Sequence, residues 1–353
     1  MTTELTLRDL NIEVPNEYKA AANKYFTDIF KRLPFNTRRS YESDLKDYYR
    51  YCFLNGYPGL SADVRLTENS IKDYVTSMCE SQLSYNTVLH RMATITKFLS
   101  IAGLPNPLRE SEYLRDFVKL ELKEHDIYNR AKQAPALRLS DLEYINNNVI
   151  PDTLLDIRDL ALINMMFDGL LRADEVTSVQ INHIDHKKNK LLIPKSKSDQ
   201  SGKGKFRYIS NTTLSYVADY IEEANYDNRK QRPKLKGDPT RISSGILFRA
   251  TSPKGTSMLP YDESVVRIKN MRRLDYTSVY RALKRIAKKS GLDLPITGHS
   301  QRVGAAVTMA EAGIAEKKIQ DAGGWTTPVM VSRYTEQADV EGGMSEISNT
   351  FKR

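Results

Sequence analysis

Apolar side chains recur every three or four residues in the first third of the chain, and this spacing predicts amphipathic helices across residues 16–100. Two segments show it most clearly. Within residues 37–53 the apolar positions fall on one helical face: Tyr41, Leu45, Tyr48 and Cys52. Residues 84–103 repeat the pattern with Val88, Met92, Ile95 and Leu99. A chain patterned in this way is predicted to bury these stripes in a helical core.

The other faces of the two helices are polar, and the polar face of the second helix carries few acidic residues. They hold Arg39, Ser43, Lys46 and Arg50 on the first helix, and Asn86, His90, Arg91, Thr94 and Lys97 on the second. Side chains of these types read base edges in the major groove of DNA. A solvated helix surface is the competing interpretation, because every surface helix has a polar side.

The length of 353 residues favours two domains. The segment "GLPNPLRE" at 103–110 ends the first helical block, and the polar stretch that follows residue 123 has the composition of an exposed connection. We expect a polar arm at 1–15, a helical domain at 16–126, a linker at 127–135 and a second domain at 136–338.

The second domain is predicted to be mainly α-helical with a small β-sheet. Ser140 and Glu143 form a capping-box pattern, and "DLALINMMFDGLL" at 159–171 predicts a buried helix. Residues 191–194 and 206–209, separated by a turn rich in Gly and Ser, predict a hairpin. Everything after residue 213 is expected to be mostly helical.

The charge pattern favours an anionic partner. Lys and Arg outnumber Asp and Glu by 53 to 44, and the basic residues are segregated: residues 186–208 hold eight of them with one Asp, and residues 267–289 hold nine with one Asp. By contrast, residues 336–347 are acidic. Such patches favour phosphate backbones, although a merely solubilising surface gives the same pattern.

Cysteine usage and hydropathy indicate the compartment. Cys52 and Cys79 are the only cysteines and lack metal-binding spacing, so we expect buried, reduced thiols and no structural zinc. The N-terminus lacks a signal-peptide pattern, and no run of 18 apolar residues occurs. We therefore expect a cytoplasmic protein without a membrane span.

Seven residues of types that can catalyse reactions of phosphate esters follow one another along the chain. They are Arg172, Glu175, Lys197, His299, Arg302, Trp325 and Tyr334. His299 and Arg302 are three residues apart, as are Arg172 and Glu175, so each pair shares a helical face. Small residues surround His299 and Arg302, which predicts close packing of that helix beneath DNA.

Together these residue types can cleave a phosphodiester without a metal. The arginines can stabilise the charge of a pentacoordinate transition state, Lys197 can protonate the departing oxygen, and Tyr334 can attack phosphorus. Each has a structural alternative: the chain has 20 tyrosines, its single Trp suits a core, and Arg172 with Glu175 suits an ordinary ion pair. Three other lysines lie close to Lys197: Lys195, Lys203 and Lys205.

The ordered set resembles the tyrosine recombinase (phage integrase) family, and specifically its Cre-like branch. Four segments carry the resemblance in the same order: "RAKQA" at 130–134, "LLRADE" at 170–175, "GHSQRVGAA" at 298–306 and "AGGWTTPVMVSRY" at 322–334. The last segment is the most specific. It keeps the interval of nine residues between Trp325 and Tyr334, and it has Trp where many family members have His.

The resemblance implies a C-shaped clamp, with a helical domain on one side of DNA and a catalytic domain on the other. It implies that Tyr334 forms a 3′-phosphotyrosine and that Arg172 and Arg302 hold the phosphate. His299 and Trp325 would donate hydrogen bonds to it, with His299 also a candidate proton acceptor. Lys197 would be the general acid and Glu175 an orienting carboxylate. Strand exchange would pass through a Holliday junction and need no metal or nucleotide cofactor.

The resemblance also implies partners. Base-contacting residues would be Arg38, Arg39, Ser40, Asn86, His90 and Arg91 in the helical domain, with Thr277 or the nearby Arg281 in the catalytic domain. The target would be double-stranded DNA with an inverted-repeat site, bound by a homotetramer on synapsed DNA within the cytoplasm, at the nucleoid. Residues 339–353 would form a helix or tail that docks into the neighbouring protomer; a frayed tail is the alternative.

Three other classes of function remain open from the sequence. One is a related enzyme: an integrase that needs accessory factors, a resolvase of hairpin ends or a type IB topoisomerase. Another is a sequence-specific DNA-binding protein without chemistry, for which Tyr334 would be a packing residue. The third is a basic protein that binds RNA or a membrane surface, which the absence of aromatic RNA-binding motifs and of a basic amphipathic anchor disfavours.

Overall fold

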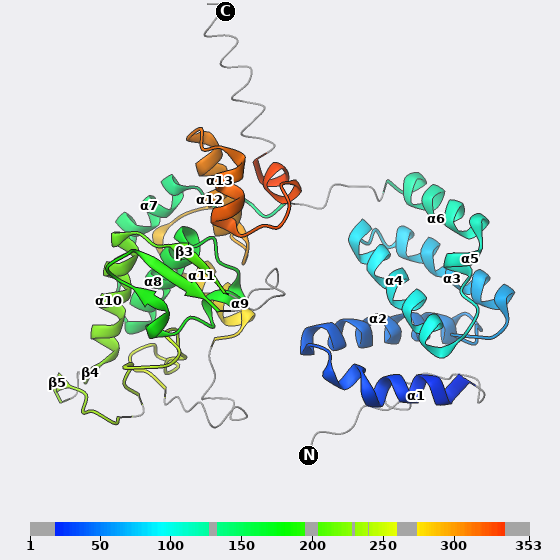
Figure 1. The fold of residues 1–353 in the computed structure, drawn as a ribbon, viewed down its shortest axis with the longest axis horizontal. Coiled ribbons are helices and arrows are strands. Elements are labelled where there is room, and N and C mark those ends of the chain that lie inside the picture. Colours follow the sequence, from blue (N-terminus) through cyan, green and yellow to red (C-terminus); the bar gives the residue numbers. More distant parts are fainter. Residues whose placement is uncertain are drawn as a thin grey trace, which may run out of the picture. The chain divides into compact units, whose positions relative to one another are not determined.

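The computed structural model describes residues 18–126, 133–194, 204–227, 230–238, 240–259 and 274–335. The chain divides into two compact units, Met1–Lys132 and Gln133–Arg353 (Figure 1). Each unit has its own apolar core. The expected arm at 1–15, the tail at 339–353 and most of the linker at 127–135 lie outside the described residues.

The first unit is helical throughout its described residues. Its elements are α1 (Lys19–Asp28), η2 (Phe30–Arg32), α2 (Phe35–Leu54), α3 (Val64–Glu80), α4 (Tyr85–Ala102), α5 (Pro107–Glu110) and α6 (Glu112–Glu124). Both predicted stripes enter the core, except that Tyr41 is only half-buried. The helix ends follow local chemistry: the carboxylate of Asp63 accepts the first backbone N–H groups of α3, and Gly103 ends α4 at a φ of 71°.

The second unit is also mainly helical and contains the small sheets. Its elements are α7 (Leu139–Asn148), α8 (Leu154–Asp168), α9 (Ala173–Val176), η3 (Ile181–His183), β1 (Ile184–Asp185), β2 (Lys190–Ile193), β3 (Lys205–Tyr208), α10 (Asn211–Ala224), β4 (Tyr226–Asp227), β5 (Arg232–Pro233), α11 (Tyr276–Ser290), α12 (Ser300–Glu311) and α13 (Glu316–Gly323). Residues 329–335 are helical as well. The predicted mainly α fold with a small sheet is confirmed.

The buried helix predicted at 159–171 forms the centre of this unit. It is α8, and α10, α11 and α12 pack around it (Figure 1). The predicted hairpin is also confirmed: β2 and β3 pair antiparallel, with Leu191 opposite Arg207. The sequence missed β1, which adds a third strand beside β2.

Two details of the second unit were predicted wrongly. The box of Ser140 and Glu143 does not form, because α7 begins earlier: the carboxylate of Asp141 accepts the backbone N–H of Arg138 at 2.8 Å. The prediction of mostly helical structure after residue 213 is wrong between residues 225 and 259. The described residues there hold the β4–β5 hairpin and isolated β-bridges. Three glycines at positive φ interrupt this stretch: Gly237, Gly245 and Gly255.

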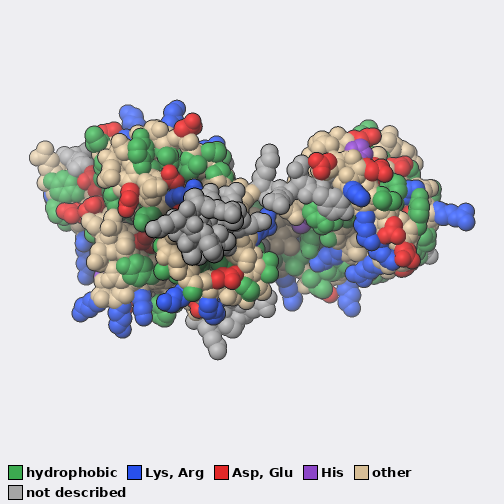
Figure 2. Space-filling model, turned by 90° about the horizontal axis from the view of Figure 1, so that it is seen from above, with side chains coloured by type: hydrophobic (Ala, Val, Ile, Leu, Met, Phe, Trp, Pro, Cys, Tyr) green, Lys and Arg blue, Asp and Glu red, His purple; other side chains and the backbone are tan. Residues whose placement is uncertain are grey.

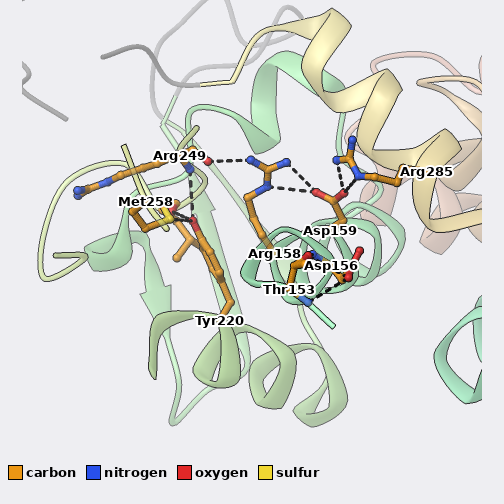
Figure 3. Close-up of polar contacts among 9 residues, drawn as sticks. Thr153, Asp156, Arg158, Asp159, Tyr220, Arg249, Met258 and Arg285 are labelled. Atoms are coloured by element: carbon orange, nitrogen blue, oxygen red, sulfur yellow. Dashed lines mark hydrogen bonds and ion pairs between the residues drawn. The ribbon is translucent and has the colours of Figure 1, made fainter. Parts of the chain in front are cut away.

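A buried carboxylate joins three parts of the second unit. Asp159, on α8, is fully buried and accepts hydrogen bonds from Arg158 at 2.8 and 3.1 Å and from Nε of Arg285, on α11, at 2.9 Å (Figure 3). Arg158 also donates to the carbonyl oxygen of Arg249 at 3.0 Å. Arg285 and Lys289, which pairs with Asp152 and Asp156, therefore support the fold and are not available to the basic patch at 267–289.

We predict that Asp159→Asn destabilises the second unit by about 3–5 kcal/mol, because it leaves a buried guanidinium without its carboxylate. The fluorescence of Trp325, the only tryptophan of the chain, reports unfolding of this unit in a denaturant titration. Lys188→Ala removes an exposed ion pair with Asp185 and should cost less than about 1 kcal/mol. Equal losses for the two variants would contradict the prediction.

Candidate active site

The turn between α8 and α9 positions Arg172. Leu170 in this turn adopts a φ of 48°, a left-handed conformation that is costly for Leu and that clusters at functional sites. Glu175 then accepts the backbone N–H of Arg172 at 2.9 Å and its guanidinium at 2.8 Å. The carboxylate is buried while the Arg172 side chain remains partly exposed. Glu175 thus holds Arg172 at both ends and leaves it accessible.

Arg302, at the start of α12, is 2% exposed although it carries a charge. Its Nη1 donates to the carbonyl oxygen of Leu170, and its Nη2 donates to that of Gly323 at 2.7 Å. The indole of Trp325 lies over the guanidinium, with 4.4 Å from Cζ to the ring centroid. Burial and the neighbouring charge of Arg172 lower the pKa of Arg302 to about 10, so it stays protonated at neutral pH.

The small residues that follow Arg302 serve packing within the chain. Gly304, Ala305 and Ala306 are buried, and a Cβ on Gly304 would overlap the backbone of Leu137. The N–H of Leu137 donates to the carbonyl oxygen of Ser300 at 3.0 Å. These residues therefore let α12 pack closely against the segment that precedes α7. The position of this helix beneath DNA stays a prediction.

His299 lies at the exposed N-terminal end of α12. Its backbone N–H donates to Oγ1 of Thr297 at 3.3 Å. Desolvation lowers the pKa of the imidazole, the charges of Arg302 and Arg172 lower it further, and the carboxylate of Glu175 acts in the opposite direction. The neutral imidazole is thereby favoured near pH 7, which suits a proton acceptor.

Trp325 and Tyr334 contact each other beside Arg302. Their ring centroids are 5.6 Å apart with an interplanar angle of 56°. Trp325 is 6% exposed, and its buried Nε1–H has no hydrogen-bond partner among the described residues. Tyr334 belongs to the helical residues 329–335 and is half-buried. A buried donor without a partner is costly, and such groups occur where a ligand completes the site.

The structure therefore brings together six of the seven predicted catalytic residues: Arg172, Glu175, His299, Arg302, Trp325 and Tyr334. Lys197 lies outside the described residues, as do Lys195 and Lys203, whereas Lys205 is in β3. Sequence reasoning missed Arg207, which is 4% exposed and donates to the carbonyl oxygens of Asp321 and Gly323. The alternation along β3 did not indicate a buried Arg207, because it favoured burial of the aromatic neighbours Phe206 and Tyr208 and exposure of Arg207.

The predicted base-contacting residues of the first unit differ in their exposure and in their side-chain contacts. Arg39 and Asn86 are exposed on α2 and α4. His90 binds the carboxylate of Asp44 at 2.7 Å and approaches Oγ of Ser40 at 3.5 Å, and Arg38 and Ser40 are partly exposed. Arg91 pairs with Asp47 at 2.5 Å and donates to Tyr74 at 3.2 Å. Arg91 thus braces the helix pair, and its contact with bases stays a prediction.

The exposed face of α11 is basic. Thr277, Arg281, Lys284 and Lys288 follow one another along it at helical spacing and are all exposed. Figure 2 shows that Lys and Arg side chains on the face in view gather in groups on each unit. Such groups create the positive potential that attracts a polyanion.

Other expectations concern metals, thiols and membranes. Cys52 and Cys79 are free and buried, as predicted, and burial raises the pKa of each thiol to about 11. Among the described residues, no three His, Cys, Asp or Glu side chains are grouped as metal ligands. In the same residues, no helix has the length and apolar character needed to span a membrane.

Similarity to known proteins agrees with this site and fold. The chain is 24% identical to the recombinase Cre of Escherichia phage P1 over 329 residues, which covers 91% of this chain and 90% of Cre. It is 23% identical to the tyrosine recombinase XerD of Listeria monocytogenes over 301 residues, 84% of this chain and 86% of XerD. The solved Tn1549 transposon integrase superposes with a TM-score of 0.58 at 15% identity, over 92% of this chain and 98% of the integrase.

The fold and these similarities define a tyrosine recombinase, an enzyme that breaks and rejoins DNA strands. The chain belongs to the phage integrase family, whose defining sequence pattern matches residues 136–341. That match spans most of the second unit, including all the described residues of the candidate site.

We predict that the pKa of His299 lies below the ordinary value of about 6.5 and responds oppositely to its two charged neighbours. Arg172→Met removes a positive charge and should raise this pKa, whereas Glu175→Gln removes a negative charge and should lower it. NMR titration of the five histidines, with His299→Gln for assignment, measures both shifts.

The same depressed pKa has a consequence for stability. Below about pH 6.5 the unfolded chain binds a proton at His299 more readily than the folded chain does, so acid weakens folding. His299→Gln should reduce this loss of folding free energy between pH 6.5 and the lower folded-state pKa.

Shifts of the His299 pKa in the same direction in Arg172→Met and Glu175→Gln would contradict the proposed electrostatic arrangement.

Proposed function

We propose that this protein is a Cre-like site-specific recombinase that cleaves and rejoins DNA at paired inverted-repeat sites through a 3′-phosphotyrosine at Tyr334. The observation that carries the proposal is the grouping of Arg172, Trp325 and Tyr334 around the buried guanidinium of Arg302, beside a Trp325 Nε1–H that has no partner among the described residues. Donors arranged in advance around one point suit a phosphate whose negative charge grows in the transition state.

Each residue has a role in the cleavage step. The phenolic oxygen of Tyr334 attacks phosphorus, the bond from phosphorus to the 5′ oxygen breaks, and the 3′ phosphate stays on the tyrosine. Neutral His299 accepts the phenolic proton, and Lys197 protonates the departing 5′ oxygen. Arg172 and Trp325 donate to the non-bridging oxygens. Attack by a 5′ hydroxyl on the phosphotyrosine reverses these steps and rejoins a strand, so no external energy source is needed.

Arg302 combines two tasks in this proposal. A guanidinium has five N–H donors, and the bonds to Leu170 and Gly323 occupy one on each terminal nitrogen. The remaining donors are available to a phosphate oxygen, but the guanidinium is buried beneath the indole of Trp325. Arg302 would therefore reach the phosphate only when this aromatic cover adjusts on DNA.

The known relatives support the proposed partners. A lambda integrase tetramer has been solved on a Holliday junction, and XerH on a palindromic substrate; these superpose on this chain with TM-scores of 0.55 at identities of 15% and 13%. We extend this arrangement to a homotetramer of this chain on synapsed DNA, with residues 339–353 docked into the neighbouring protomer. A protein acting on such DNA would work in the cytoplasm at the nucleoid.

We predict that Tyr334→Phe abolishes covalent attachment to DNA while leaving non-covalent binding unchanged. The protein is incubated without added metal with nicked duplexes of randomised sequence, and DNA that stays bound to protein in detergent is recovered and sequenced. Phe keeps the ring against Trp325, so a lost adduct reports the missing hydroxyl and not the packing.

Tyr208→Phe is the matched control, because Tyr208 is an exposed tyrosine outside the proposed site, and it should keep the adduct. An adduct that survives in Tyr334→Phe would exclude this nucleophile. No adduct from wild-type protein that binds the same pool would favour a DNA-binding protein without chemistry. The recovered sequences would also show whether the sites form inverted repeats.

We also predict that Asn86→Ala relaxes base preference at one or two positions of the bound sites, by about 1–3 kcal/mol at each. Asn86 is exposed on α4 and can contact base edges. Arg91→Ala should instead lower the stability of the first unit, because Arg91 pairs with Asp47 inside the helix pair. Sequencing of bound DNA separates the two effects, and unchanged preferences in Asn86→Ala would remove it from the interface.

A further inference from the structure

Arg207 is a buried cation that the proposed cleavage step leaves unused. It lies on β3 and is 4% exposed. Its Nη1 donates to the carbonyl oxygen of Asp321 at 3.3 Å, and its Nη2 donates to that of Gly323 at 3.2 Å. Both acceptors belong to the last turn of α13, and the carbonyl of Asp321 also accepts the backbone N–H of Gly324 at 3.1 Å.

The carbonyl oxygen of Gly323 is shared by two arginines. Nη2 of Arg302 donates to it at 2.7 Å, beside the bond from Arg207. The positions of the two guanidiniums are therefore coupled through one backbone atom. Because Trp325 comes two residues after Gly323 and lies over Arg302, any shift of this carbonyl moves both the indole and Arg302.

The two glycines of this turn are shaped around the same side chains. Gly324 has a φ of 63°, and a Cβ there would overlap the Arg207 guanidinium. A Cβ on Gly323 would overlap the indole of Trp325. The turn thus leaves room for the Arg207 guanidinium at Gly324 and for the Trp325 indole at Gly323, because neither residue carries a Cβ.

The charges around Arg207 connect it to the rest of the site. Burial lowers the pKa of Arg207, and Glu175 and Arg172 act on it in opposite directions. Nε of Arg207 is buried and has no hydrogen-bond partner among the described residues. A buried guanidinium that leaves one N–H unsatisfied would be a poor choice for stability alone, and Nε of the other buried arginine, Arg249, does have an acceptor.

We propose that Arg207 is a positioning residue for strand cleavage: it fixes the Gly323 carbonyl and thereby sets the placement of Trp325 and Arg302. The inference rests on the proposed function where cleavage is concerned, whereas the placement of Trp325 is independent of it. Arg207 acts through the backbone and has no described contact with Tyr334.

The first test reads the position of Trp325 directly, since its fluorescence is the only tryptophan signal of the chain. Arg207→Met keeps an unbranched side chain up to the position of Nε and removes the guanidinium with both donated bonds. We expect increased quenching of Trp325 by acrylamide and a red-shifted emission in the folded protein. Arg207→Lys keeps the charge but loses the forked geometry, so it should restore the emission only in part.

Arg249→Met is the matched control. Arg249 is also a buried arginine of the second unit, and it likewise donates to backbone carbonyls, those of Ile246, Arg241 and Ser244. This variant should lose stability without changing Trp325 emission in the folded protein. If Arg207→Met loses stability to a similar extent but keeps native emission and quenching, Arg207 is only a structural residue and the proposal fails.

The second test measures the single-turnover rate of adduct formation on the nicked duplexes recovered with wild-type protein. We expect Arg207→Met to lower this rate about 10- to 100-fold, with DNA affinity within about threefold, and Arg249→Met to keep the wild-type rate per folded molecule. A wild-type rate in Arg207→Met would overturn the positioning role. Absence of any wild-type adduct would refute the proposed function instead, while the fluorescence test would still decide the placement.

A double-mutant cycle tests the coupling to Gly324. Gly324→Ala is expected to disturb Trp325 emission strongly, because its Cβ meets the Arg207 guanidinium. In an Arg207→Ala background this overlap is removed, so the added effect of Gly324→Ala should be smaller than in wild-type protein. Strictly additive effects would show that the two residues do not act on each other.

Discussion

The catalytic unit depends on the hydrogen bonds and nearby charges that stabilise the buried guanidinium of Arg302. Moving a charge out of water is costly unless hydrogen bonds and nearby charges replace the lost hydration. Here the replacement comes from two backbone carbonyls, at Leu170 and Gly323, from the face of Trp325 and from the field of Glu175. None of these is a direct carboxylate contact, so the positive charge is stabilised without being neutralised. A neutralised arginine would offer less to a phosphate.

This arrangement requires three segments far apart in the sequence to meet. Leu170 presents its carbonyl from a left-handed turn after α8, Arg302 comes from the first turn of α12, and Gly323 comes from the end of α13. The ion pairs of Asp159 join α8 to α11 beneath them, and the contact of Gly304 with Leu137 fixes α12. The stability of the second unit and the geometry of the site therefore have the same origin.

Much of the fold could be predicted from the sequence because local patterns determine it. The stripes of α2 and α4, the apolar run of α8 and the β2–β3 pairing follow from periodicity, and the proposed site residues follow from motifs in order. The buried arginines could not be predicted in this way. On β3 the pattern is the reverse of expectation: Phe206 and Tyr208 are each 64% exposed, whereas Arg207 points inward. Only the carbonyls of α13, more than a hundred residues later, make that orientation favourable.

Unpartnered polar atoms distinguish this region from an ordinary core. The described residues near Arg302 include three side chains with buried atoms that lack partners: Nε1 of Trp325, Nε of Arg207 and both amide atoms of Gln301. A core selected for stability alone would replace such groups with apolar ones, since each costs about 1–3 kcal/mol when left unsatisfied. Their concentration beside a charged, carbonyl-bound arginine indicates that stability is given up for polarity at this place. Among these groups, Nε1 of Trp325 is the donor that the proposed cleavage step uses, so an atom that weakens the fold supports a role in holding a phosphate.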